Sequence, residues 1–330
     1  MGKFIQYELW KDCCTHCKFC YNKGEPLTDK QFKLERLAYI KGKLLSEECD
    51  LFDEIGFIGG EFFEKQLEDP DIRNGFYELF DICTDKYQRG KLNKLCVCTS
   101  LIFDLNKYFL PFVNYLYAKH LTDITLICTS YDTKYRFHTQ DKEDLWKDNV
   151  ILLHDKYDQL KIHTETLLTQ DFINKVLSGE FKIQEFCKTY HTTIDYIEPS
   201  TGFYYADKYQ MAKVLPDFYP TKESFFEFMY YTVCDERSIS IQDLLNPFLR
   251  ANVLYYTNNN EYMVIRGRQR NPDRRILKKV TVEDLDYGKE VRTVPQVLKD
   301  FDRGFIDSNM SMLDAVYQFR DTVLGGQDVY

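Results

Sequence analysis

Short apolar stretches alternate with longer amphipathic ones from the start of the chain to about residue 200. The short stretches are rich in β-branched and aromatic residues, and their length is typical of strands. They predict six strands, over Phe4–Leu9, Glu54–Ile58, Leu95–Thr99, Ile124–Ser130, Leu160–Leu167 and Thr193–Ile197. The longer stretches repeat apolar residues at helical spacing, and they predict helices over Asp29–Glu47, Gly75–Tyr87, Leu105–Ala118, Lys142–Asp155 and Phe172–Leu177.

This strand-then-helix order indicates a parallel sheet, because parallel neighbours need a crossover of about a dozen residues or more. Six such units fit either an open doubly wound sheet or an incomplete barrel, and periodicity alone does not decide between them. In the first predicted helix Thr28 is the expected N-cap. The apolar positions expected to face the core are Phe32, Leu34, Leu37, Ile40 and Leu44.

The alternation stops at Gly202. Beyond it the sequence predicts an aromatic, partly helical segment, a hairpin whose turn is Thr257–Glu261, and two closing helices. These elements are expected over Tyr204–Phe228, Val253–Tyr256 with Tyr262–Arg266, Val294–Phe301 and Ser311–Val323. We therefore expect two parts, an α/β core over 1–202 and a C-terminal α+β extension, a cap or small subdomain, over 203–330.

Composition narrows the class of protein. Hydrophobic residues make up 44% and aromatic residues 16% of the chain, which is typical of a globular protein. The net charge of −9 argues against broad, sequence-independent binding to nucleic acid. The sequence has no recognisable signal peptide and no run of the roughly 20 apolar residues that a membrane helix needs. We expect a soluble, cytoplasmic protein with no membrane partner.

Four of the 11 cysteines lie between positions 13 and 20. An odd number of cysteines in a chain of this size does not suit a secreted disulfide scaffold, so a metal site is the better interpretation. Cys13, Cys17 and Cys20 have the spacing C-x3-C-x2-C, which can hold a four-iron cluster and leave one iron without a protein ligand. The ferredoxin register from Cys14 fails, because its fourth cysteine would fall on Gly24. A zinc site that includes His16 stays open.

A second motif, Gly59-Gly60-Glu61, follows the second predicted strand directly. Two glycines let the backbone approach a ligand closely, and the Glu61 carboxylate can accept a hydrogen bond from an amine. Taken with the three cysteines and the aromatic Phe19 before Cys20, this arrangement resembles the radical S-adenosylmethionine (radical SAM) superfamily over roughly residues 4–200.

The resemblance implies an incomplete (β/α)6 TIM-like barrel in which residues 1–202 form a radical SAM core domain. It implies a 4Fe-4S cluster on Cys13, Cys17 and Cys20, and S-adenosyl-L-methionine as the second cofactor. The cofactor-binding positions that it implies are Gly59, Gly60, Glu61, Phe19, Ser130, Arg136 and Glu198. Ser130 and Arg136 would lie near the ribose and carboxylate of S-adenosyl-L-methionine, and Glu198 near adenine or substrate. An electron donor such as a flavodoxin or ferredoxin would be the partner.

The implied reaction is reductive cleavage of S-adenosyl-L-methionine to a 5′-deoxyadenosyl radical, which abstracts hydrogen from a peptide or a small metabolite. A second hypothesis keeps this chemistry and takes a nucleotide or nucleic acid as substrate. It is motivated by a basic run that consists of Arg266, Arg268, Arg270, Arg274, Arg275, Lys278 and Lys279. The alternative from another class is a zinc- or cluster-stabilised binding protein without catalytic activity.

Weaker candidates lie on the later strands. In the fifth strand His163 and Glu165 share one face, and Thr164 and Thr166 share the other. Either pair could contact substrate or cofactor, although ordinary packed or solvated polar residues are the favoured interpretation. Asp195 and Pro199 accompany Glu198 at the end of the sixth strand. Cys96 and Cys98 share a strand face and are interpreted as buried, inert thiols.

Overall fold

The structure is a computed structural model of the 330-residue chain. It describes residues 4–17, 19–20, 28–132, 134–197, 217–218, 220, 224 and 228, and the backbone of three later strands at 253–256, 262–265 and 278–279. The cofactor-binding candidate Glu198 and most of the basic run lie outside these residues, as do Pro199 and the two closing helices predicted near the C-terminus.

All six predicted strands are present, each to within one residue of its expected ends. They are β1 (Phe4–Glu8), β2 (Glu54–Ile58), β3 (Lys94–Cys98), β4 (Thr125–Ser130), β5 (Lys161–Leu167) and β6 (Thr192–Ile197). Each strand pairs in parallel with the next one along the chain, so the spatial order follows the sequence order. The sheet therefore winds in one direction, which excludes the doubly wound alternative.

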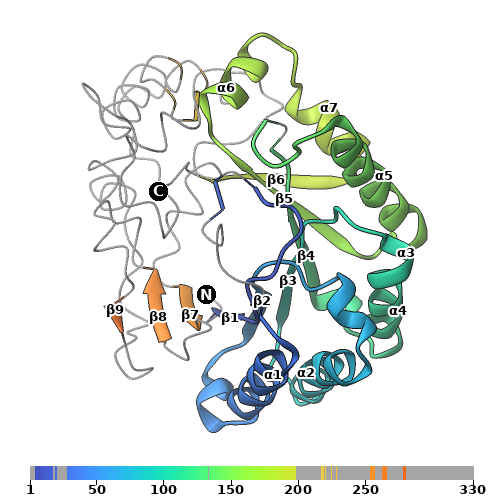
Figure 1. The fold of residues 1–330 in the computed structure, drawn as a ribbon, viewed down its shortest axis with the longest axis vertical. Helices are drawn as coiled ribbons and strands as arrows, with labels where there is room; N and C mark the ends of the chain where they lie inside the picture. Colours follow the sequence, from blue (N-terminus) through green and yellow to red (C-terminus); the bar gives the residue numbers. More distant parts are fainter. Residues whose placement is uncertain are drawn as a thin grey trace.

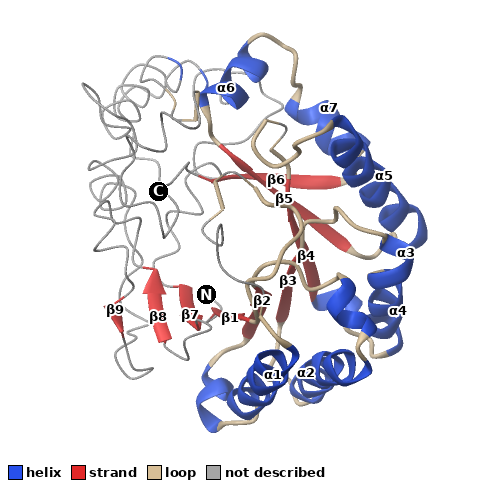
Figure 2. Ribbon diagram, viewed as in Figure 1, coloured by secondary structure: helices blue, strands red, loops and turns tan. Residues whose placement is uncertain are grey.

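Winding in one direction places the crossover helices on one face of the sheet, because each right-handed crossover turns to the same side. The helices are α1 (Lys30–Leu44), α2 (Pro70–Gln88), α3 (Leu105–Tyr108), α4 (Leu110–Ala118), α5 (Gln140–Lys156), α6 (Gln170–Leu177) and α7 (Ile183–Thr189). Figure 1 shows α1, α2, α4, α5 and α7 along the outer side of a curved sheet, and Figure 2 shows the two layers by colour. The described core is an open α/β sheet with the form of a partial barrel.

Helix boundaries depart from the expected ones where capping chemistry decides them. Asp29, not Thr28, caps α1, and its carboxylate accepts from Phe32 N. Helix α2 starts five residues earlier than predicted, at Pro70, because Asp69 caps it and proline suits the first turn. The predicted helix over Leu105–Ala118 is two helices that meet at Phe109. The short α7 was not predicted.

The C-terminal hairpin is confirmed. Strands β7 (Val253–Tyr256) and β8 (Tyr262–Ile265) are antiparallel, and a short β9 (Lys278–Lys279) follows them in the sheet. The attachment of this hairpin was not predicted: β7 pairs in parallel with β1 and extends the sheet to nine strands. The predicted helical segment over 204–228 is described at too few positions to test it.

An aromatic cluster fills the space between the sheet and the helices near β2. Phe63 lies at its centre, fully buried, with its ring 4.6 Å from Phe109 and 5.0 Å from Phe112, centre to centre. Phe80 joins the sheet to this cluster, because its ring is 4.9 Å from Phe57 of β2. The cluster fixes the segment that follows Gly59–Glu61. No helix within the described residues is long and apolar enough to cross a membrane.

Candidate functional site

The two sequence motifs lie side by side at the carboxyl ends of β1 and β2. Beyond the strands the backbone continues to pair: Leu9 N donates to Ile58 O at 2.8 Å, Gly60 N to Trp10 O at 2.7 Å and Glu61 N to Asp12 O at 2.7 Å. The chain that enters the cysteine loop is thus hydrogen-bonded along the Gly-Gly-Glu turn. In parallel barrels this rim is where active sites form.

Both glycines are required by the close approach of these two segments. A Cβ added at Gly60 would lie 2.5 Å from the carbonyl carbon of Asp12 and closer still to its oxygen. A Cβ at Gly59 would overlap the carbonyl oxygen of Trp10. Within the part of the chain that the structure describes, the carbonyl oxygens of Gly59 and Gly60 accept no hydrogen bond. They remain available as acceptors at the rim.

The Glu61 carboxylate is fully buried and binds the end of β3. It accepts from Thr99 Oγ1 at 2.9 Å, from Ser100 N at 2.6 Å and from Phe63 N at 3.1 Å. Burial raises the pKa of Glu61 to about 7, although the hydrogen bonds from Ser100 and Phe63 oppose this shift. The side chain therefore locks the turn to β3, and its expected contact with an amine stays a prediction.

The cysteine loop is held by neighbours that the sequence did not single out. Thr15 Oγ1 lies 2.9 Å from Cys13 Sγ and 3.4 Å from Cys17 Sγ, so one hydroxyl contacts two of the three predicted ligands. His138 Nε2, from the segment before α5, lies 2.9 Å from the carbonyl oxygens of Thr15 and His16 and donates to them. Glu64 Oε1 accepts from the backbone of the exposed Cys14 at 2.9 Å. Burial raises the pKa of the Cys13 thiol to about 12, and Glu61 adds to this rise.

Arg136 lies beside the three predicted ligands. Burial disfavours its charge, but the electrostatic influence of Cys17, Asp132, Cys20 and Cys13 outweighs that effect and raises the pKa of Arg136. The guanidinium carbon lies 5.5 Å from the centre of the Phe19 ring, and Nε lies 3.5 Å from Asp132 Oδ2. Nε is buried and has no hydrogen-bond partner among the described residues.

The polar residues of β4 and β5 divide between two faces. Thr164 and Thr166 are buried and bonded within the protein, Thr166 to Tyr131 O at 2.7 Å and Thr164 to Thr192 Oγ1 at 2.8 Å. His163, Glu165 and the predicted Ser130 are half-buried on the opposite face, where Ser130 is the register partner of Glu165. That face points away from α5, because Thr129 on the other side binds Trp146 of α5.

Three thiols meet in the same sheet between β3 and β4. The Cys128 thiol contacts both Cys96 and Cys98, and Gln6 Nε2 donates to Cys98 Sγ at 3.6 Å. The hydrogen bond with Cys96 lowers the pKa of Cys128, but the contact with Cys98 and burial raise it well above its usual value. The pKa of Cys96 is raised as well, so Cys96 and Cys128 are protonated and poor nucleophiles, in line with the inert role predicted for Cys96.

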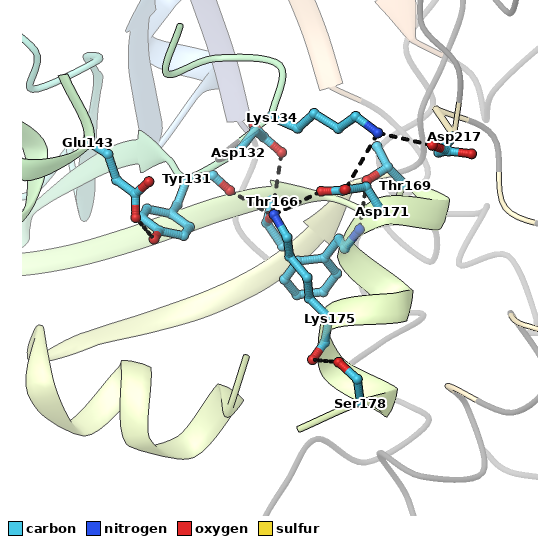
Figure 3. Close-up of polar contacts among 11 residues, drawn as sticks. Tyr131, Asp132, Lys134, Glu143, Thr166, Thr169, Asp171, Lys175, Ser178 and Asp217 are labelled. Carbon is cyan, nitrogen blue, oxygen red and sulfur yellow. Dashed lines mark hydrogen bonds and ion pairs between the residues drawn. The ribbon is translucent and has the colours of Figure 1, made fainter. Parts of the chain in front are cut away.

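A small pocket that was not predicted from the sequence lies between the carboxyl ends of β4 and β5 and helix α6, and Figure 3 shows the polar contacts around it. Lys134 pairs with Asp171 at 3.5 Å and with Asp217 at 3.0 Å, and Lys175 pairs with Asp171 at 3.1 Å. Tyr131, in the wall of the pocket, donates to Glu143 at 2.6 Å. Lys134, Asp171 and Lys175, which line this pocket, are thus paired with one another and with Asp217, and Asp132 of the lining is paired with Arg136.

The cysteine loop fits an iron–sulfur cluster in its donor chemistry. It offers three soft sulfur ligands, and beside them lies a buried guanidinium whose Nε has no hydrogen-bond partner among the described residues. Among the residues that the structure describes, no group of three or more His, Cys, Asp or Glu side chains is already arranged to hold a metal ion. The Cys13 and Cys17 thiols contact Thr15 instead.

Comparisons with known proteins say little about the function of these residues. No family model matches the sequence, and no curated protein matches it. Among solved structures, the chain is similar to the crystal structure of Streptococcus suis SuiB, with a TM-score of 0.44 and 12% sequence identity. The alignment covers 90% of this chain and 67% of that chain. A likeness this distant carries no functional conclusion, so function must be argued from the site itself.

Proposed function

We propose that this protein is a radical SAM enzyme with a 4Fe-4S cluster on Cys13, Cys17 and Cys20. The observation that carries the proposal is the backbone pairing of the segment that enters the cysteine loop with the Gly59–Glu61 turn. Two motifs that are about 40 residues apart in sequence lie side by side at one rim of the sheet. Gly59 and Gly60 pack so closely against the segment before the cysteines that a side chain at either position would not fit. An ordinary turn at the end of a strand would not need both features.

Each residue at this rim has a distinct task in the proposed enzyme. The free carbonyl oxygens of Gly59 and Gly60 accept from the amino group of S-adenosyl-L-methionine, while the buried Glu61 keeps the turn in place. Arg136 supplies a positive charge between the thiols and the carboxylate of the cofactor. Ser130 offers a hydroxyl to the ribose, and the Phe19 ring shields the loop. Glu198 is assigned to adenine or substrate from the family resemblance alone.

The chemistry that the cofactors supply when bound is reductive cleavage of S-adenosyl-L-methionine to a 5′-deoxyadenosyl radical, which abstracts hydrogen from the substrate. The protein binds, orients and excludes water. We propose a peptide or small metabolite as substrate and a flavodoxin or ferredoxin as electron donor. A nucleotide or nucleic-acid substrate is the second possibility, and it rests on the basic run, of which Lys278 and Lys279 form β9.

The test is anaerobic reconstitution with iron and sulfide, followed by reduction and an assay for 5′-deoxyadenosine. A variant with Cys13, Cys17 and Cys20 changed to alanine should lose both iron and product. The matched control is Cys14→Ala, which removes an exposed thiol from the same loop but lies outside the proposed ligand set. It should keep both, because the C-x3-C-x2-C register does not use it.

Cleavage of S-adenosyl-L-methionine by the triple variant would refute the proposal that a cluster on Cys13, Cys17 and Cys20 carries the reaction. One zinc ion per chain without iron or sulfide would instead support the non-catalytic, zinc-stabilised binding protein. Loss of iron in Cys14→Ala with retention in Cys13→Ala would show that the other register holds the metal. Circular dichroism of each apo variant establishes that the fold is intact.

A further inference from the structure

Asp12 lies directly before the cysteine loop and binds the Gly-Gly-Glu turn through its backbone. Its carbonyl oxygen accepts from Glu61 N at 2.7 Å. The same carbonyl group would overlap any Cβ placed at Gly60. The backbone of Asp12 therefore fixes the distance between the start of the cysteine loop and the turn.

The side chain of Asp12 binds the far end of the same loop. Its carboxylate accepts from Thr28 N at 2.8 Å through Oδ1 and from the Thr28 hydroxyl through Oδ2. Lys33 Nζ, from the first turn of α1, lies 3.0 Å from Oδ2 and donates to Thr28 O at 2.5 Å. One carboxylate thus joins Thr28 to Asp12, and Lys33 is bound to both residues.

In this cluster of Asp12, Thr28 and Lys33, which we name the loop clasp, the charged pair is almost fully buried and Thr28 is half-buried. The side chains of Asp12 and Lys33 are 6% and 8% exposed. Two charges removed from water are costly unless they are paired and hydrogen-bonded, and an apolar pair would often stabilise a fold equally well. Such a pair is best explained by the geometry that it fixes. Arg36, one turn further along α1, binds Glu8 O at the end of β1 at 2.5 Å and holds the helix in register with the clasp.

We propose that Asp12, with Lys33 as its counter-ion, is the positioning residue that sets the cysteine loop against the Gly59–Glu61 turn. This inference rests on the proposed function insofar as the loop holds a cluster. The loop clasp has no contact with the thiols in the described structure, and it acts by limiting the conformations that the loop can sample. Without it, the three thiols would converge less often, and a cluster would be bound more weakly and less uniformly.

The experiment compares Lys33→Met and Asp12→Asn with wild type, using the full-length chain. Lys33→Arg is the conservative variant, because it retains the charge that faces Asp12. Lys41→Met is the matched control: Lys41 lies on the same helix and forms an exposed ion pair with Glu78 at 2.7 Å. Thr28→Val provides a milder test, because it removes one hydroxyl contact and leaves both charges.

Two readouts separate positioning of the loop from general stability. In the apo protein, trypsin cleavage at Lys18 and Lys23 reports opening of the loop without any need for a cluster. After anaerobic reconstitution, iron content and the electron paramagnetic resonance spectrum of the reduced cluster report how the thiols are arranged. Lys33→Met and Asp12→Asn should speed cleavage by about tenfold or more, as loss of a local restraint predicts. They should also lower the iron content and broaden or shift the spectrum.

Lys33→Arg should restore the wild-type cleavage rate and spectrum, and Lys41→Met should not change them. The proposal is overturned if Lys33→Met and Asp12→Asn leave both readouts unchanged, or if they change them only in proportion to the unfolded fraction. If these two variants do not fold, Thr28→Val must still speed cleavage, and an unchanged rate overturns the proposal. Failure of wild type to bind iron would defeat the proposed function, whereas the cleavage comparison would still test the loop clasp.

Discussion

The substitution Gly60→Ala directly tests the packing on which the site depends. The new Cβ would lie 2.5 Å and 2.6 Å from the carbonyl carbons of Asp12 and Lys11. Carbon atoms in ordinary contact are about 3.5–4.0 Å apart, so one segment would have to move by about 1 Å or more. All the obstructing atoms belong to the backbone, which cannot give way by a change of rotamer.

Such a movement would break the hydrogen bonds from Gly60 N to Trp10 O and from Glu61 N to Asp12 O, each 2.7 Å long. Overpacking in a rigid environment costs about 1–3 kcal/mol, and each lost hydrogen bond adds about 1 kcal/mol. We therefore expect Gly60→Ala to lower the free energy of unfolding by about 3–5 kcal/mol.

The assay is urea denaturation of the apo protein, with the shift in midpoint at constant slope giving the loss of stability. Gly42→Ala is the control, because Gly42 lies in α1 with no atom within 4 Å of the added Cβ. This change should stabilise the protein by up to about 1 kcal/mol through helix propensity. If Gly60→Ala is as stable as wild type, the close approach of the two motifs is wrong, and the main support for the proposed function is lost.

Two further perturbations test the surroundings of the site. Because the pKa of Glu61 is raised from 4.5 to about 7, the folded protein retains a proton that the unfolded chain releases, and stability should fall by up to about 3 kcal/mol as the pH rises through that range. Glu61→Gln should remove this pH dependence from the urea midpoints measured at both ends of the range. An unchanged pH profile in this variant would contradict the assignment of the raised pKa to Glu61. Phe63→Ala should lower the free energy of unfolding by about 3–5 kcal/mol because it leaves a cavity, whereas Tyr117→Ala at an exposed position of α4 should change it by less than about 0.5 kcal/mol. Similar losses for the two variants in thermal unfolding would contradict the central place of Phe63 in the aromatic cluster.

Local periodicity was sufficient to find the strands, because each buried strand is a short apolar run whatever its neighbours are. It was less reliable for the inner face of α1. Apolar residues there predicted Phe32 and Leu34 as core positions, and both are half-buried and pack against the core, but the side chains almost fully buried at the start of the helix are Lys33 and Arg36. The spacing of Lys33 from Leu37 does fit the buried face. A lysine on the buried face of this helix was therefore the feature of the sequence that could have pointed to the loop clasp.

The sequence by itself determined the order of the strands along the chain, the cysteine motif and the Gly59–Glu61 turn, since each of these depends on neighbouring residues. Only the tertiary structure decided that the sheet winds in one direction, that β7 joins β1, and that Asp12 binds both ends of the cysteine loop. It also decided that Gly60 faces the protein's own backbone and that Arg136 lies among the cysteines. These features depend on contacts between residues far apart in sequence, and such contacts follow from strand register and backbone distance, which no local pattern records.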